Sequence, residues 1–174
     1  MIRFRSLLRA VVIAGCALLL PAPLVIPTAA AKTVTFKGVG AGFPINLPDN
    51  WRVKTIERGI EISSPDREIY LWVEGIDAST VNRVVQGYFD YFKQQGVITR
   101  QPIAKKKDVI GGVDVILMDI PARYDGATTI VRLLMADPRP NERKGLFIGY
   151  WASPKGDKQH DDTMGGIMTD LLRP

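Results

Sequence analysis

The sequence predicts an α+β fold in which an antiparallel β-sheet, built from hairpins, is sandwiched between helices. Residues 68–74, EIYLWVE, alternate as a strand and are apolar on both faces, so both faces of the sheet should be covered. Residues 81–92 repeat apolar side chains at intervals of three and four, which is typical of an amphipathic helix. Gly111-Gly112 and Asp125-Gly126 each separate two apolar runs, which indicates tight hairpin turns.

The first part of the expected domain is extended. Residues 32–42, KTVTFKGVGAG, contain three glycines, but no helix start follows them, so we expect a flexible entry segment rather than a phosphate-binding loop. Residues 43–48, FPINLP, alternate between prolines and predict a strand. Short extended segments at 51–53 and 59–63 follow and end at a Ser-Pro-Asp turn.

The Asp125-Gly126 turn fixes the register of the longest hairpin. It places Ile120 opposite Val131 and, on the other face, Asp119 opposite Arg132. We therefore expect Asp119 and Arg132 to form a cross-strand ion pair with a structural role.

The last part of the domain contains a loop, a strand and a helix. Residues 137–145 are rich in proline and charge and predict a loop, and residues 146–152, LFIGYWA, predict the closing strand. An apolar stripe predicts a final helix over residues 158–172. Gly165-Gly166 inside this helix costs about 1 kcal/mol per glycine relative to alanine, so we expect close packing on the sheet or local fraying.

The first 31 residues predict a secretory signal peptide that is removed. Three arginines precede the apolar run 11–20, and Ala29-Ala30-Ala31 supplies the small residues of a cleavage site. Prolines at 21, 23 and 27 make the run too short for a transmembrane helix. Residues 13–16, IAGC, resemble a bacterial lipobox, but the apolar run continues beyond Cys16, so lipid anchoring through Cys16 is the alternative. We expect a periplasmic or secreted protein.

Composition narrows the classes of function. The whole chain carries a formal net charge of +5. Removal of the three leader arginines leaves 20 basic and 18 acidic residues, which is a net charge of +2. The charges are interspersed, which disfavours nucleic acid as a partner. The mature chain has no cysteine and therefore no disulfide or thiolate. Lys105-Lys106-Lys107 is typical of a protected sheet edge.

No motif predicts catalysis, so we expect no enzyme activity, no cofactor and no metal site. His160, the only histidine, precedes two aspartates and is interpreted as a solvated helix start rather than a metal ligand. A hydrolase using Ser63, Ser64 or Ser153 with His160 is the alternative, because a serine nucleophile needs a base and an orienting group.

The loop at residues 137–145 is the candidate partner contact, and a solvated hairpin loop without a partner is the alternative. It carries Arg139, Arg143 and Lys144, and two prolines restrict it. The expected partner is an envelope protein or protein complex.

The order of these elements and the segment FPINLPDNW at residues 43–51 resemble the PsbP-like and DcrB-like superfamily, whose fold the Ran-binding nuclear-import factor shares. The resemblance covers residues 43–172. It implies an α/β/α sandwich as a single domain over residues 43–174 and an accessory or binding role, with no catalytic residue to carry over.

Overall fold

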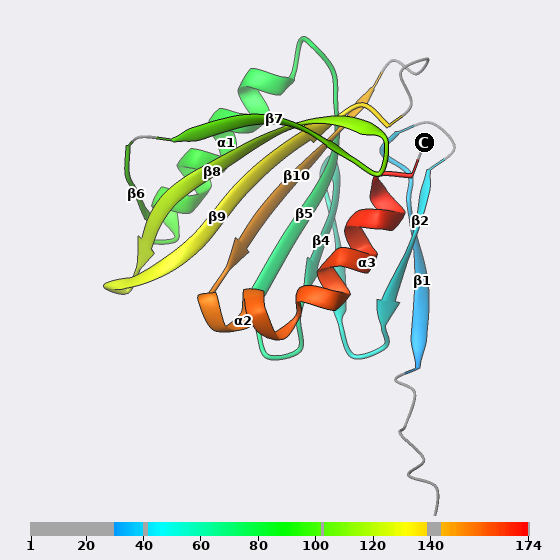
Figure 1. Cartoon of the computed structure of the whole chain (residues 1–174), viewed down its shortest axis with the longest axis horizontal. Coiled ribbons are helices and arrows are strands. Elements are labelled where there is room, and N and C mark those ends of the chain that lie inside the picture. The colour runs from blue at the N-terminus through cyan, green and yellow to red at the C-terminus, as the bar shows by residue number, and fades with distance from the viewer. Residues whose placement is uncertain (1–29, 40–41, 102, 139–143, 174) are drawn as a thin grey trace, which may run out of the picture.

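The structure, a computed structural model, describes residues 30–39, 42–101, 103–138 and 144–173. Within them the chain forms an eight-stranded antiparallel sheet, a separate two-stranded sheet and three helices, shown in Figure 1. Helices cover both faces of the large sheet. The predicted α+β sandwich is therefore confirmed.

The spatial order of the strands in the large sheet differs from their order in the sequence. The last strand lies between a strand from the first half of the domain and a strand from the second half, and it pairs with both. In spatial order its strands are β3 (Arg52–Ile56), β4 (Gly59–Ser63), β5 (Ile69–Ile76), β10 (Gly145–Ala152), β9 (Ala127–Ala136) and β8 (Val113–Tyr124). The free side of β8 pairs with two shorter strands, β6 (Ile98–Thr99) and β7 (Ala104–Ile110).

Both predicted hairpin turns are present. Asp125 and Gly126 have φ values of 48° and 74°, and Gly111 and Gly112 have φ values of 60° and 85°, which is the left-handed backbone that two-residue turns require. The β8–β9 register is the predicted one, with Asp119 opposite Arg132. The three lysines at 105–107 lie exposed on β7, which pairs only with β8 among the described strands.

One face of the sheet packs against α1 (Val81–Gln94). The buried side chains of this helix recur with helical spacing at Val84, Tyr88 and Phe92, and they contact Trp72 of β5 and its neighbours. The helix therefore buries the apolar stripe that the sequence predicted, and this contact holds α1 against the sheet.

A polar network is enclosed on the same face and was not predicted. Glu74 of β5 is 2% exposed. Its carboxylate accepts hydrogen bonds from the Tyr88 hydroxyl and from Arg58 Nε, each at 2.6 Å. Burial and the adjacent Glu74 carboxylate raise the pKa of Tyr88.

The opposite face packs against α2 (Pro154–Gln159), α3 (Asp161–Leu171) and the two-stranded sheet of β1 (Ala31–Phe36) and β2 (Phe43–Pro48). The flexible entry segment predicted over residues 32–42 differs from the structure, because residues 31–36 pair with β2 along its full length. Asp170 of α3 accepts hydrogen bonds from Asn46 N (2.9 Å) and Nδ2 (3.0 Å), which holds this sheet against α3.

The C-terminal helix begins earlier than predicted and is divided in two. Pro154 occupies the first turn of α2, and the Ser153 side chain caps it by accepting a hydrogen bond from Gly156 N at 2.9 Å. His160, with φ −109° and ψ 16°, separates α2 from α3. No helix among the described residues is long and apolar enough to cross a membrane.

Candidate functional site

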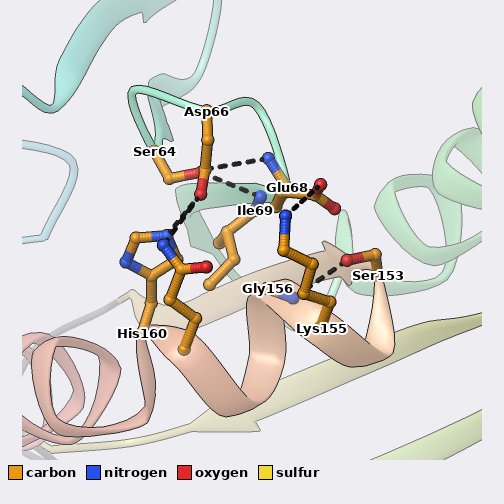
Figure 2. A network of polar contacts seen from close by, with 9 residues as sticks. Ser64, Asp66, Glu68, Ile69, Ser153, Lys155, Gly156 and His160 are labelled. Atoms are coloured by element: carbon orange, nitrogen blue, oxygen red, sulfur yellow. Dashed lines mark hydrogen bonds and ion pairs between the residues drawn. The ribbon is translucent and has the colours of Figure 1, made fainter.

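The candidate catalytic residues are brought together in part, around the loop that joins β4 to β5 (Figure 2). The Ser64 hydroxyl donates to Asp66 Oδ1 at 2.6 Å, and His160 Nε2 lies 2.9 Å from Asp66 Oδ2. Ser64 also accepts a hydrogen bond from Ile69 N at 3.0 Å. The carboxylate therefore stands between the serine and the histidine, whereas a serine nucleophile needs the imidazole next to its hydroxyl.

The other two serines do not complete such a site. Ser153 caps α2, and Ser63 is buried on β4 opposite Tyr70. His160 is not the solvated residue that the sequence predicted, because its side chain is only 12% exposed and its ring meets Trp51 edge-on at 5.4 Å. Sequence reasoning missed this contact because Trp51 and Asp66 lie far from His160 along the chain.

The loop contacts make Asp66 strongly acidic. Partial burial opposes its ionisation, but hydrogen bonds from Ser64, His160 and the Glu68 amide outweigh burial and lower its pKa to about 2. A carboxylate with so low a pKa is a poor proton acceptor at neutral pH. The described residues contain no group of three or more His, Cys, Asp or Glu side chains that could hold a metal ion.

A groove of about 380 Å³ lies between α3 and the sheet, and we call it the α3 groove. Its apolar lining comes from β5, β7, β8, β9, β10 and α3, and it includes Leu71, Ile110, Leu117, Leu134, Ile148, Met164 and Met168. Among these lining residues, the side chains of Leu117 and Met168 are only partly buried. An apolar hollow with a few converging polar groups is the usual form of a binding site.

Charged residues form one end of the α3 groove. Arg132 lies 3.0 Å from Asp119 and 3.2 Å from Asp157, so the predicted Asp119–Arg132 pair is present and is extended by a third residue. The two paired side chains at the sheet, Arg132 and Asp119, are 41% and 53% exposed, so this pair is solvated. The Tyr150 hydroxyl donates to Asp157 at 2.7 Å, and burial together with that carboxylate raises the pKa of Tyr150.

The charges that line the α3 groove do not cancel. They comprise the carboxylates of Asp119, Asp157 and Asp161 and the guanidinium of Arg132, a formal net charge of −2. Asp161 is exposed at the first turn of α3, and its side chain makes no hydrogen bond or ion pair with the described residues. The groove therefore combines an apolar floor with an uncompensated negative end.

Two adjacent glycines on α3 differ in their position relative to the α3 groove. Gly165 lines the α3 groove, whereas Gly166 does not. A Cβ atom added at either position would meet no atom within 4 Å. Neither predicted explanation for this pair applies, because the glycines do not pack closely on the sheet and α3 continues through them. The absent side chain at Gly165 leaves the groove open.

The predicted partner loop falls mostly outside the described residues, and so do Cys16 and the leader up to residue 29. Arg139 and Arg143 lie in the undescribed part. Lys144 is described and exposed, directly before β10. The role of this loop stays a prediction.

Comparison with solved structures gives the relationship of this fold. The solution structure of the cyanobacterial PsbP protein CyanoP from Synechocystis matches 90% of this chain and 96% of its own, with a TM-score of 0.55 and 8% sequence identity. The chain has a PsbP-like fold. This confirms the resemblance at the level of the fold, which is all that such low identity supports.

Two further matches have lower TM-scores. Protein PA94 of unknown function from Pseudomonas aeruginosa is 18% identical, with 83% of this chain and 98% of that chain covered and a TM-score of 0.39. A Bacteroides thetaiotaomicron structure is 12% identical, with 76% and 45% covered and a TM-score of 0.49. No protein-family model and no curated protein matches the sequence. The PsbP-like fold thus leaves the function to be argued from the site.

Proposed function

We propose that this protein is an exported, non-catalytic binding domain whose α3 groove holds a segment of a partner protein of the cell envelope. The segment would carry apolar side chains next to lysine or arginine. The observation that carries the proposal is the open apolar groove with a net charge of −2 at its lining. The PsbP-like fold supports it as a scaffold, and the structural engagement of Ser64, Ser153 and His160 argues against hydrolysis.

Apolar side chains of the partner would be held by the half-buried part of the floor. Leu117 of β8 and Met168 of α3 are only partly buried, so a bound segment would remove further apolar surface from water. Each square ångström of apolar surface removed contributes roughly 25 cal/mol before the costs of association. Methionine adapts its shape to different partners, which suits a groove that accepts an apolar segment.

A cation of the partner would be held by Asp161. Arg132 already neutralises part of Asp119 and Asp157, but the Asp161 carboxylate has no partner among the described residues. An anionic segment would face the net negative charge of the lining and be repelled. Charge complementarity therefore favours a basic, apolar segment over an acidic one.

The test uses short synthetic amphipathic peptides of leucine and lysine, with a leucine–glutamate peptide of the same pattern as control. Fluorescence anisotropy should detect binding of the lysine peptide only. Gly165→Leu should weaken that binding about tenfold or more, because its side chain would enter the groove. Gly166→Leu is the matched control and should leave binding unchanged.

Asp161→Asn should weaken binding of the lysine peptide and reduce its dependence on salt. Equal effects of the two glycine substitutions, or equal binding of both peptides, would contradict the proposal. The export part of the proposal rests on the leader, and mass spectrometry of the exported chain tests it separately. An N-terminus near Lys32 is expected, whereas a diacylated Cys16 would replace this part with a membrane-anchored protein.

A further inference from the structure

A second hollow, of about 350 Å³, lies on the α1 side of the sheet near the β8–β9 hairpin, and we call it the aromatic cavity. Four aromatic side chains line it, and they come from four different elements: Tyr70, Tyr91, Tyr124 and Trp151. Tyr124 is 46% exposed, which is unusual for a large side chain in this protein. The cavity is independent of the α3 groove, with which it shares no lining residue.

The rings of the aromatic cavity are held in place. Tyr70 stacks on Trp151 with centroids 5.6 Å apart and planes at 28°, and Tyr124 meets Trp151 edge-on at 5.1 Å. Trp151 Nε1 donates to Thr129 Oγ1 at 2.9 Å, and Thr129 in turn donates to the carbonyl of Ala152 at 2.8 Å. A ligand ring would thus meet a preorganised wall.

Polar groups are interspersed with these rings. Three of the aromatic residues are tyrosines and carry hydroxyls, and Gln95 and Ser153 add an amide and a further hydroxyl to the lining. Ser153 Oγ accepts a hydrogen bond from Gly156 N and keeps its own proton for donation. Rings next to several hydroxyl and amide groups suit a sugar, which presents C–H faces and hydroxyls together.

The lining of the aromatic cavity includes one cation, Arg67. Arg67 lines this cavity beside Glu68, whose carboxylate is paired with Lys155 at 3.6 Å. Arg67 also lines an adjoining hollow in which the cations Lys32, Arg52 and Lys54 outnumber the carboxylates of Asp49 and Glu61. Arg67 is exposed, and its guanidinium makes no hydrogen bond or ion pair with the described residues. Its φ of 61° lies in the left-handed region, which is strained for a residue with a side chain.

We infer that the aromatic cavity binds an acidic sugar, with the sugar ring against Trp151 and Tyr70 and the carboxylate paired with Arg67. A guanidinium holds a carboxylate through two parallel hydrogen bonds, so Arg67 would select acidic over neutral sugars. The backbone strain at Arg67 fits this role, because glycine would suit the turn better but would supply no charge.

The test follows the Trp151 indole N–H by NMR during titration with glucuronate, glucose, inorganic phosphate and uridine monophosphate. Glucuronate should shift this signal, and glucose should bind about tenfold more weakly. Arg67→Gly should lower the affinity for glucuronate to that for glucose while raising the melting temperature by roughly 2–4 °C. Tyr124→Ala should weaken the binding of both sugars. Arg83→Ala, on the exposed side of α1, is the control and should weaken the binding of neither sugar.

Several outcomes would overturn the assignment. Glucuronate could leave the Trp151 signal unmoved, or Arg67→Gly could leave its affinity unchanged. A shift of the same size with inorganic phosphate would reduce the Arg67 site to a nonspecific anion contact. Tighter binding of uridine monophosphate than of glucuronate would replace the sugar with a nucleotide.

Discussion

Replacing Arg58 with methionine should destabilise the protein by about 3 kcal/mol, because it leaves the buried Glu74 carboxylate without its cation. Removing one partner of a buried ion pair costs about 3–5 kcal/mol. The lower end applies here, since Arg58 is 45% exposed and Glu74 retains the Tyr88 hydroxyl at 2.6 Å. For a domain of this size the melting temperature should fall by roughly 6–12 °C.

Urea unfolding at neutral pH measures this effect. The double change Arg58→Met with Glu74→Leu should recover much of the lost stability. Arg83→Met, at an exposed site of α1, is the control and should stay within about 0.5 kcal/mol of the parent. A loss below about 1 kcal/mol for Arg58→Met would refute the reasoning, since Glu74 would then be solvated without Arg58.

Three further predictions concern stability. Asp119→Asn should lower the free energy of unfolding by no more than about 1 kcal/mol, because the pair with Arg132 is exposed and Arg132 still pairs with Asp157. A loss above about 3 kcal/mol in thermal unfolding would contradict this. The pKa of Asp66 is lowered to about 2, so its contribution to stability is present above its unfolded pKa of 3.8 and lost as the pH falls toward 2. The melting temperatures of Asp66→Asn and the parent should therefore converge as the pH falls to about 2, and a constant difference would count against the loop network. Gly166→Ala should stabilise α3 by about 0.8–1 kcal/mol in urea, and an unchanged or lowered stability would contradict the open space at this position.

Local sequence signals predicted much of this fold. The Asp125-Gly126 turn and the alternation on either side of it were enough to place Asp119 opposite Arg132. The spacing of Val84, Tyr88 and Phe92 was enough to predict α1 and its buried face. Both signals depend on residues close together in the chain, where the backbone period determines which side chains share a face.

The features that escaped prediction depend on distant parts of the chain. Residues 31–36 look like a linker because their burial depends on β2 and, through Asn46 and Asp170, on α3. The Asp66–His160 contact joins residues 94 apart in sequence. The α3 groove likewise requires side chains from several strands and two helices, so no single motif marks it.

The sequence also could not predict the open space beside Gly165. A glycine pair inside an apolar helical stripe usually suggests close helix packing, yet a Cβ atom would meet nothing at either position. Only the arrangement of α3 against the sheet reveals that one of the two glycines lines a groove and the other does not. This difference gives the proposed function its matched pair of variants.

The most direct test of the α3 groove as the binding site is an NMR titration of the mature protein with the leucine–lysine peptide, following backbone amide signals. We expect the largest shifts along the lining of the groove, at Leu117, Gly165 and Met168, and small shifts at Tyr124 and Arg67 of the aromatic cavity. Shifts that are confined to the opposite face of the sheet, or an absence of shifts at the groove while the peptide binds, would contradict the account.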